Sequence, residues 1–267
     1  MKNILVLVHD DEGQEARLQV AFDLVRAVRG HLTCVDVVAI PVFVGDYLGA
    51  GGDALLLADE QARETANATA LKQRFGHEDV PYDWIDSSGD PADCVRAAAK
   101  LADLIVVNRR LDGSWYPEMS EITSELVARS GRPVMAVPGD ARRLDVTGNV
   151  VIAWDGSDPA GSAMRAALPL LGFARSVTVL QVDDGSVKVQ AVEAAIYLAR
   201  HDIVATVQIE DGRGQKVSDI LRTVIAARNA NYLVMGGFDH ARWVESMLGG
   251  TTATMVDHSP VPVLLVH

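Results

Sequence analysis

The chain has 267 residues and a net charge of −12. Its length suits two domains of ordinary size, and its acidity disfavours binding to phosphate backbones. Hydrophobic residues make up 49% of the chain but aromatic residues only 5%, which is typical of aliphatic cores between helices and a parallel sheet. No apolar run reaches the roughly 20 residues of a membrane helix. We therefore expect a soluble, cytoplasmic protein with no nucleic-acid and no membrane partner.

The first half of the chain alternates short β-branched runs with Ala- and Arg-rich helical stretches. The first run is too short for a secretory signal and favours a strand instead. A loose glycine-containing segment and a predicted helix are inserted at 40–75. The expected strands cover residues 3–9, 32–39, 81–86, 103–108 and 133–137.

The second half shows the same alternation, with expected strands at 149–154, 176–182, 203–209, 231–235 and 262–266. Strands and helices that alternate in this way indicate an α/β fold with a doubly wound parallel sheet and right-handed crossovers. A polar stretch at 139–148 separates the halves. We expect two tandem five-stranded domains, at 1–142 and 147–267.

The two halves are copies of one unit. Residues 4–10 align with 149–155 at an offset of 145, whereas 103–108 align with 231–236 at an offset of 128. The fall in offset indicates an insertion of about 17 residues in the first half. Segment 40–75 is the natural place for this insertion, and its role stays open.

A ligand site is expected beyond the carboxyl ends of the second-half strands, where the strand order reverses. The turn Asp155-Gly156-Ser157 follows the first of these strands, and Val182 ends the second. Ser157 suits a helix N-cap better than a nucleophile.

The loop after the fourth second-half strand is the most informative segment. It is bracketed by Gly236-Gly237 and Gly249-Gly250, and Thr251 then opens the last helix. Glycine lets a backbone approach a bulky anion, and a helix start offers unpaired N–H groups. The alternative is that these glycines form only a turn and a helix cap.

The strand that ends in Asp-Gly-Ser, the Val-Met-Gly strand, the glycine loop and the closing Pro-Val-Pro-Val-Leu-Leu-Val together resemble the universal stress protein family. The resemblance covers both halves and implies a tandem member with two Rossmann-like domains, similar to the adenine nucleotide alpha hydrolases. It also implies that 133–137 and 262–266 pair along their edges, so that the halves form an intramolecular pseudo-dimer. A homodimer is expected as well.

The resemblance also implies which residues bind a nucleotide. Family members that bind ATP carry Gly-x2-Gly-x9-Gly-(Ser/Thr) after the fourth strand, and this loop holds ribose and phosphates. Gly236 and Gly249 match the first and third glycines, Asp239 replaces the second, and Gly250 takes the Ser/Thr position before Thr251. A register shifted by one residue uses Gly237, Gly250 and Thr251 but places His240 at the second glycine. The nucleoside would contact Asp155 and Val182, with Gly156 beside them.

Asp239 is the main departure from the family pattern. Its bulk and charge near a polyphosphate cost about 1 kcal/mol or more at a partly exposed site. Arg242 or a bound Mg²⁺ would offset this repulsion. ATP or AMP, with Mg²⁺, is therefore the expected ligand of the second half, bound weakly.

The first half departs further from the pattern. Asn108, Leu111, Glu121 and Ile122 stand at its four loop positions, so Glu121 is expected where a phosphate would lie. We expect no phosphate-bearing ligand there. Trp115-Tyr116 would either pack over the vacated site or line an apolar pocket.

Other chemistry has little support in the sequence. No two histidines have the His-x3-His spacing of a helical zinc site, so no metal site is expected. Cys34 and Cys94 suit two reduced thiols. The leading hypothesis is a non-enzymatic stress-response protein. The alternatives are a scaffold that holds an apolar ligand under 40–75, with Leu55–Leu57 as a lid, and slow ATP hydrolysis at the second-half loop.

Overall fold

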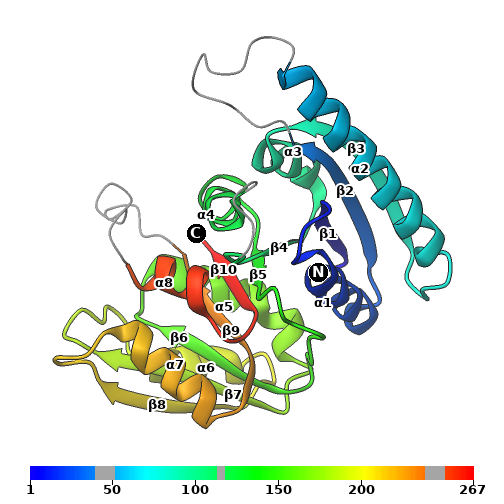
Figure 1. Ribbon diagram of the computed structural model, residues 1–267. Helices are drawn as coiled ribbons and strands as arrows, with labels where there is room; N and C mark the ends of the chain where they lie inside the picture. Colours follow the sequence, from blue (N-terminus) through cyan, green and yellow to red (C-terminus); the bar gives the residue numbers. More distant parts are fainter. Residues whose placement is uncertain (40–51, 113–117, 238–249) are drawn as a thin grey trace.

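The computed structural model describes residues 1–39, 52–112, 118–237 and 250–267, and the side chains of all of these except 52–56. The first half follows the predicted alternation of strands and helices (Figure 1). Its elements are β1 (Asn3–Val8), α1 (Gln14–Val28), β2 (His31–Ala39), α2 (Gly52–Phe75), β3 (Tyr82–Gly89), α3 (Pro91–Ala98), a 3₁₀ turn (Ala99–Leu101), β4 (Leu104–Asn108), α4 (Met119–Arg129) and β5 (Val134–Val137).

The second half repeats this order with shorter helices. Its elements are β6 (Asn149–Trp154), α5 (Asp158–Leu171), β7 (Ser176–Asp183), α6 (Ala191–Ala199), β8 (Ala205–Asp211), α7 (Val217–Ala227), β9 (Ala230–Gly236), α8 (Thr251–His258) and β10 (Val263–Val266). The inserted segment contains α2, which has 24 residues where its counterpart α6 has 9. None of the helices in the described ranges has the length and apolar character that a membrane span requires.

All ten strands form one sheet in the order β3-β2-β1-β4-β5-β10-β9-β6-β7-β8. Strands within each half are parallel, and each half reverses its strand order at its first strand, β1 or β6. The predicted fold class is therefore confirmed. Observed strand bounds differ from the predicted ones by up to three residues, as at β3, whose polar end Ser87–Gly89 continues to pair with β2.

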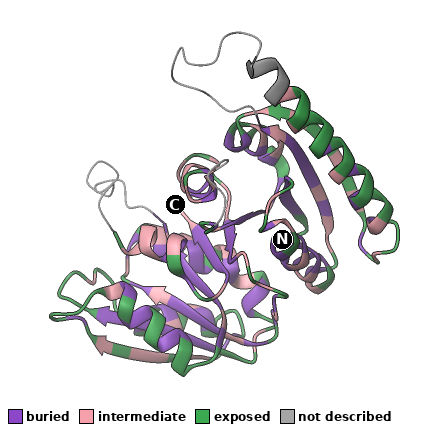
Figure 2. Ribbon diagram, in the orientation of Figure 1, coloured by how far each residue is buried: buried purple, intermediate pink, exposed green. Residues whose placement is uncertain are grey.

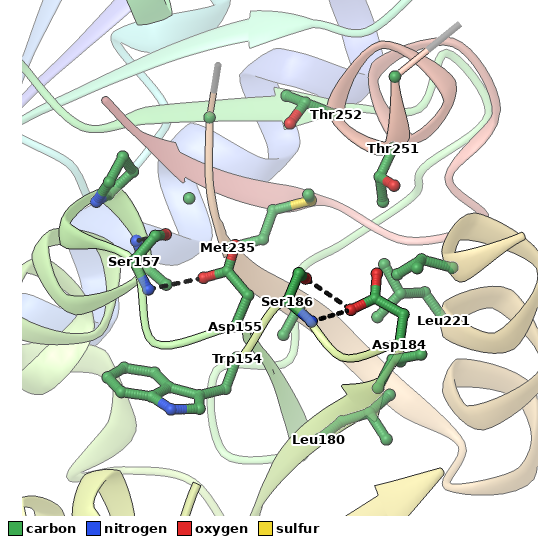
Figure 3. A pocket seen from close by; sticks show the side chains of 18 of the residues that line it. Trp154, Asp155, Ser157, Leu180, Asp184, Ser186, Leu221, Met235, Thr251 and Thr252 are labelled. Carbon is green, nitrogen blue, oxygen red and sulfur yellow. Dashed lines mark hydrogen bonds between the residues drawn. The ribbon is translucent and has the colours of Figure 1, made fainter. Parts of the chain in front are cut away.

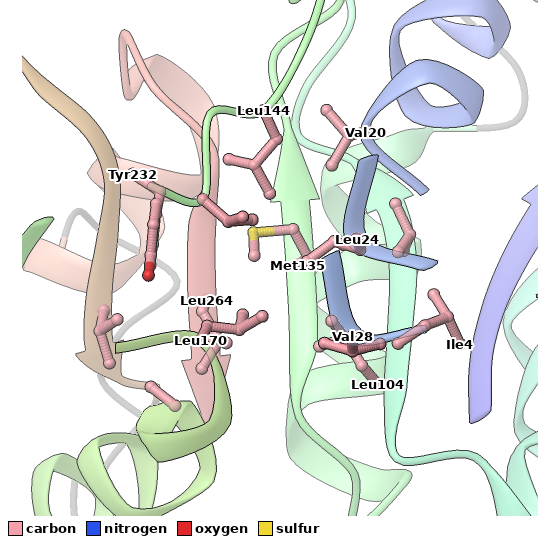
Figure 4. Close-up of a cluster of buried hydrophobic side chains, with 14 of the residues drawn as sticks. Ile4, Val20, Leu24, Val28, Leu104, Met135, Leu144, Leu170, Tyr232 and Leu264 are labelled. Atoms are coloured by element: carbon pink, nitrogen blue, oxygen red, sulfur yellow. The ribbon is translucent and has the colours of Figure 1, made fainter. Parts of the chain in front are cut away.

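The two halves join where β5 pairs with β10 in antiparallel fashion. Met135 lies opposite Leu264 at this join, and both side chains are fully buried (Figure 4). The pairing satisfies two strand edges that would otherwise be open. The pseudo-dimer predicted from the family resemblance is thus present within one chain.

Two apolar layers cover the sheet, one on each face, and both run through the two halves (Figure 2). Helices α1, α2, α5 and α6 pack on one face, and α3, α4, α7 and α8 on the other. Each fully buried aliphatic side chain contributes roughly 1.5–3 kcal/mol to folding. The segment between the halves is also anchored, because Leu144 is buried beside the join and its N–H donates to Asp23 of α1.

Candidate functional site

A cavity of about 260 Å³ opens in the second half where β6, β7 and β9 end and α8 begins (Figure 3). This is the point where the strand order reverses, as expected for a ligand site in a doubly wound sheet. Six of the predicted site residues line the cavity together: Asp155, Val182, Gly236, Gly237, Gly250 and Thr251. Asp239 and Gly249 lie outside the described residues.

The turn after β6 is held by hydrogen bonds on both sides. The Asp155 side chain accepts from the N–H of Ser157, and the Asp155 carbonyl accepts from the N–H of Lys188, each at 2.9 Å. Gly156 has φ +74°, and a Cβ on it would lie 2.1 Å from the nitrogen of Val189. Gly156 is therefore required by the turn itself and supports the cavity without lining it.

Ser157 begins α5 as predicted. Its Oγ accepts from the N–H of Ala160 at 3.3 Å, so the side chain is an N-cap. The predicted N-cap is therefore confirmed, and Ser157 is 9% exposed.

The loop after β7 forms a wall that the sequence analysis did not assign. Asp184 accepts from both the N–H and the hydroxyl of Ser186 (Figure 3). Trp154 donates its indole N–H to the carbonyl of Val189 at 2.8 Å. These bonds fix the loop beside the cavity. Asp184, Ser186 and Lys188 line it, and the signal for them was the turn sequence Asp-Asp-Gly-Ser directly after a strand.

The interior of the cavity is largely apolar. Leu180 and Val182 come from β7, Met235 from β9 and Leu221 from α7, and all four are buried. Among the described lining residues the charged ones are Asp155, Asp184 and Lys188. An apolar interior with a few polar groups at its rim suits a flat organic ring with a polar substituent.

Gly236 and Gly237 allow close packing around the end of β9. A Cβ on Gly236 would lie 2.7 Å from the nitrogen of Ala160, which belongs to α5. A Cβ on Gly237 would lie 2.6 Å from Val127 of α4, so the first half packs closely against the end of β9 here. The N–H of Gly237 donates to Val266 at 2.8 Å. The two glycines therefore have packing roles whatever binds in the cavity.

Helix α8 presents its N-terminus to the cavity. Gly250 occupies the N-cap position, and no described side chain caps the helix there. Thr251, Thr252 and Ala253 follow and line the cavity, so the N–H groups of the first turn face a space that a ligand can enter.

The first half differs at the start of the corresponding helix, α4. Glu118 caps α4 by accepting from the N–H of Ser120 at 3.3 Å, so a carboxylate occupies this helix start. The sequence alignment placed Glu121 at this helix start, but the structure has Glu118 at that position. Both helices have a serine at the C-cap, Ser130 in α4 and Ser259 in α8, but α4 has 11 residues and α8 has 8. The additional residues of α4 lie at its start, so Glu121 lies within the helix instead of before it.

Buried Arg17 joins α1 to the ends of β1 and β4 in the first half. Its guanidinium donates to the side chains of Asp11 and Asn108 and to the backbone carbonyls of Leu7 and His9, at 2.5–2.7 Å. Arg17 is the fourth residue of α1 and Asn108 the last of β4.

Glycines stand at the matching second-half positions. Gly161 is the fourth residue of α5, and Gly236 is the last of β9. The first half therefore holds an arginine and an amide where the second half has two glycines. Trp115 and Tyr116 lie outside the described residues, and so do the side chains of Leu55 and Leu56.

The family comparison agrees with this pair of related domains. The Universal stress protein family matches at residues 1–138 and again at 147–267. The chain belongs to the universal stress protein family. A search of curated proteins gave no match.

Solved structures support the tandem fold. A universal stress protein from Archaeoglobus fulgidus has a TM-score of 0.76 and 18% identity, covering 99% of this chain and 97% of that one. A putative universal stress protein from Pseudomonas aeruginosa has a TM-score of 0.66 and 15% identity, covering 100% and 93%. At these identities the likeness shows the fold alone.

Proposed function

We propose that this universal stress protein binds an adenine nucleotide, AMP or ATP, in its second half and acts in a stress response without catalysing a reaction. The observation that carries the proposal is the cavity between the Asp155 turn and the start of α8, which no described side chain caps. One end of this cavity is apolar, and the other offers backbone N–H groups.

Each end of the cavity suits one part of a nucleotide. Leu180, Val182 and Leu221 provide apolar walls for the base. Asp155 accepts one hydrogen bond from Ser157, and a carboxylate accepts several, so it can also accept from a ribose hydroxyl. The N–H groups at Thr251 and Thr252 and the helix dipole would stabilise a phosphate.

Charge favours AMP over ATP without a metal ion. Asp155 and Asp184 at the rim are opposed by Lys188 alone among the described lining residues. Asp239 adds a further negative charge in the sequence of the loop. Mg²⁺ would reduce repulsion with a triphosphate, so ATP affinity is expected to depend on Mg²⁺ more than AMP affinity does.

The absence of a catalytic role rests on the residues at the cavity. No histidine is among the described lining residues, and the hydroxyl of Ser157 is used as a helix cap. A general base and an activated nucleophile are the usual requirements of hydrolysis. Slow ATP hydrolysis remains the alternative; phosphate release that follows the intact protein and is lost in Gly249→Glu would establish it.

Thermal melting tests the nucleotide proposal. Millimolar AMP or ATP with MgCl₂ should raise the melting temperature, because a ligand that binds only the folded state stabilises it. Gly249→Glu, which places a carboxylate beside the start of α8, should abolish the rise. No rise with either nucleotide would contradict the proposal and favour a scaffold that holds an apolar ligand.

We also propose that the protein is cytoplasmic and that two chains associate as a homodimer. Support comes from membership of the family and from the open sheet edges at β3 and β8. Light scattering after size-exclusion chromatography would give the mass directly, and a mass of one chain at micromolar concentration would contradict the homodimer.

A further inference from the structure

In the first half, α2 brings two glutamates over the end of β1. Glu60 and Glu64 are one helical turn apart and face His9, the residue that follows β1. Nδ1 of His9 lies 2.8 Å from Oε1 of Glu64 and 3.8 Å from Oε1 of Glu60. The three ligand-type atoms all lie within 4.8 Å of one another.

These groups are shielded from water. His9 and Glu64 are each 1% exposed, and the side chain of Glu60 is 16% exposed. The second half has no equivalent of this arrangement among its described residues, because α2 belongs to the inserted segment and its counterpart α6 is far shorter. Sequence analysis missed the group, since it searched for histidine pairs and His9 is distant from α2 in sequence.

The hydrogen bonds and ion pairs of His9, Glu60 and Glu64 compensate only part of the negative charge of the two carboxylates. Glu64 accepts from the N–H of Asp10 at 2.9 Å and from His9, and Glu60 pairs with Arg63 at 2.7 Å. Nδ1 of His9 also faces the carbonyl of Val37 at 3.1 Å, so this nitrogen carries a proton in the metal-free protein.

A second observation comes from a carboxylate beside this group. Asp36 on β2 is 6% exposed, and its Oδ1 has no hydrogen-bond partner among the residues that the structure describes. Burial, and then the nearby charges of Glu64 and Asp86, raise the pKa of Asp36 to about 7. A buried carboxylate oxygen without a donor is costly, and this one lies within electrostatic reach of Glu64. The region therefore holds more buried negative charge than its own donors satisfy.

Another unsatisfied oxygen belongs to Asp11. Its Oδ2 has no partner among the described residues, although its side chain is only 5% exposed and its Oδ1 pairs with Arg17. Asp11 also interacts electrostatically with His9. Buried carboxylate oxygens without a described donor therefore interact electrostatically with both members of the His9–Glu64 pair.

We propose that His9, Glu60 and Glu64 form a binding site for one divalent metal ion of the zinc or manganese type. One imidazole and two carboxylates suit such ions, with water in the remaining positions. The ion displaces the proton on Nδ1 of His9 and competes with Arg63 for Glu60. Asp36 stays outside the coordination shell and favours the ion through its charge.

The consequence is structural. The ion would join the inserted helix α2 to the end of β1, and binding to the folded state alone stabilises it. This site is separate from the second-half cavity, so it neither requires nor implies a nucleotide.

Equilibrium dialysis of the full chain against Zn²⁺, followed by metal analysis, tests the proposal. We expect one tightly bound Zn²⁺ per chain, with affinity reduced about tenfold or more in Glu60→Gln. Glu60 is chosen because it is partly exposed, whereas Glu64→Gln removes a buried acceptor and endangers the fold. Melting of Glu60→Gln in EDTA should match the unaltered chain.

The matched control is Glu125→Gln, which also removes a carboxylate paired with an arginine on a helix, at 3.0 Å from Arg129. It should leave Zn²⁺ binding unchanged. A second readout is the imidazole ¹⁵N spectrum, in which the His9 signals should move on addition of one equivalent of Zn²⁺. Equal binding in both variants, unmoved His9 signals, or no tight binding at all would overturn the proposal, the first two indicating adventitious metal on an acidic surface.

Discussion

Nη1 of Arg17 donates to Oδ1 of Asn108 at 2.5 Å across the end of β1, where glycines, Gly161 and Gly236, stand at the matching positions of the second half. A buried cation bonded to four acceptors therefore joins α1 to the ends of β1 and β4 in the first half. In the second half, the absence of a side chain on Gly236 lets α5 pack closely against β9 instead.

Replacing this arginine should unfold the first half readily. Arg17→Ala leaves Asp11 with an unpaired buried charge, and breaking a buried pair in this way costs about 3–5 kcal/mol. Urea denaturation would measure the loss. Arg222→Ala is the control, because its side chain is half-exposed and 4.0 Å from Asp219, so a change of less than about 0.5 kcal/mol is expected.

The first half also limits nucleotide stoichiometry. We expect at most one nucleotide per chain, because the Glu118 carboxylate caps the start of α4, whereas no described side chain caps the start of α8. Equilibrium dialysis with labelled AMP measures the ratio. Two nucleotides per chain would contradict this account of the first half.

The fold could be predicted from the sequence because its signals are local and repeated. The strands other than the edge strands β3 and β8 are short apolar runs, and the second copy of the unit supports the assignments made in the first. Arg17 could not be predicted in the same way. Between Gln14 and Gln19 it resembles a solvent-exposed residue of a helix, and only the packing of α1 against β1 and β4 places it in the interior.

The join between the halves should carry a large share of the stability. Met135 of β5 is fully buried opposite Leu264 of β10, so Met135→Ala removes contacts in both halves and costs about 2–5 kcal/mol. Leu101→Ala is the control, since Leu101 is 84% exposed. If Met135→Ala melted like the control, the β5–β10 pairing would contribute little to holding the halves together.

The cap of α5 supports the turn that borders the cavity. Ser157→Ala leaves the N–H of Ala160 without its acceptor and should cost about 1 kcal/mol. Lys216→Ala provides the comparison, because Lys216 is at the N-cap position of α7 but makes no side-chain cap. Thermal melting should therefore separate the two variants, and equal melting temperatures would argue against a stabilising role for the Ser157 hydroxyl.

The candidate site could be predicted only in part. Spacing in the sequence pointed to residues that meet at one cavity, namely Asp155, Val182, Gly236, Gly237 and Gly250. It gave no sign of Trp154, whose indole holds the loop after β7, because that bond joins residues 35 positions apart. The sequence spacing also could not locate the start of α4, because α4 has an additional helical turn there and the two halves therefore do not align at a constant offset.

Gly236 offers the sharpest test of the cavity. In Gly236→Ala the new methyl group would lie 2.7 Å from the nitrogen of Ala160, so β9 and the start of α5 must separate. Overpacking of this kind costs about 1–3 kcal/mol. The shift in cavity walls should also abolish the rise in melting temperature with AMP.

Gly172→Ala is the control for Gly236→Ala. A methyl group there would lie 3.7 Å from the carbonyl of Leu168, which is an ordinary contact. This variant should melt close to the unaltered chain and keep its response to AMP. If Gly236→Ala were destabilised yet still responded fully to AMP, the nucleotide would have to bind away from the end of β9, and the cavity would lose its assigned role.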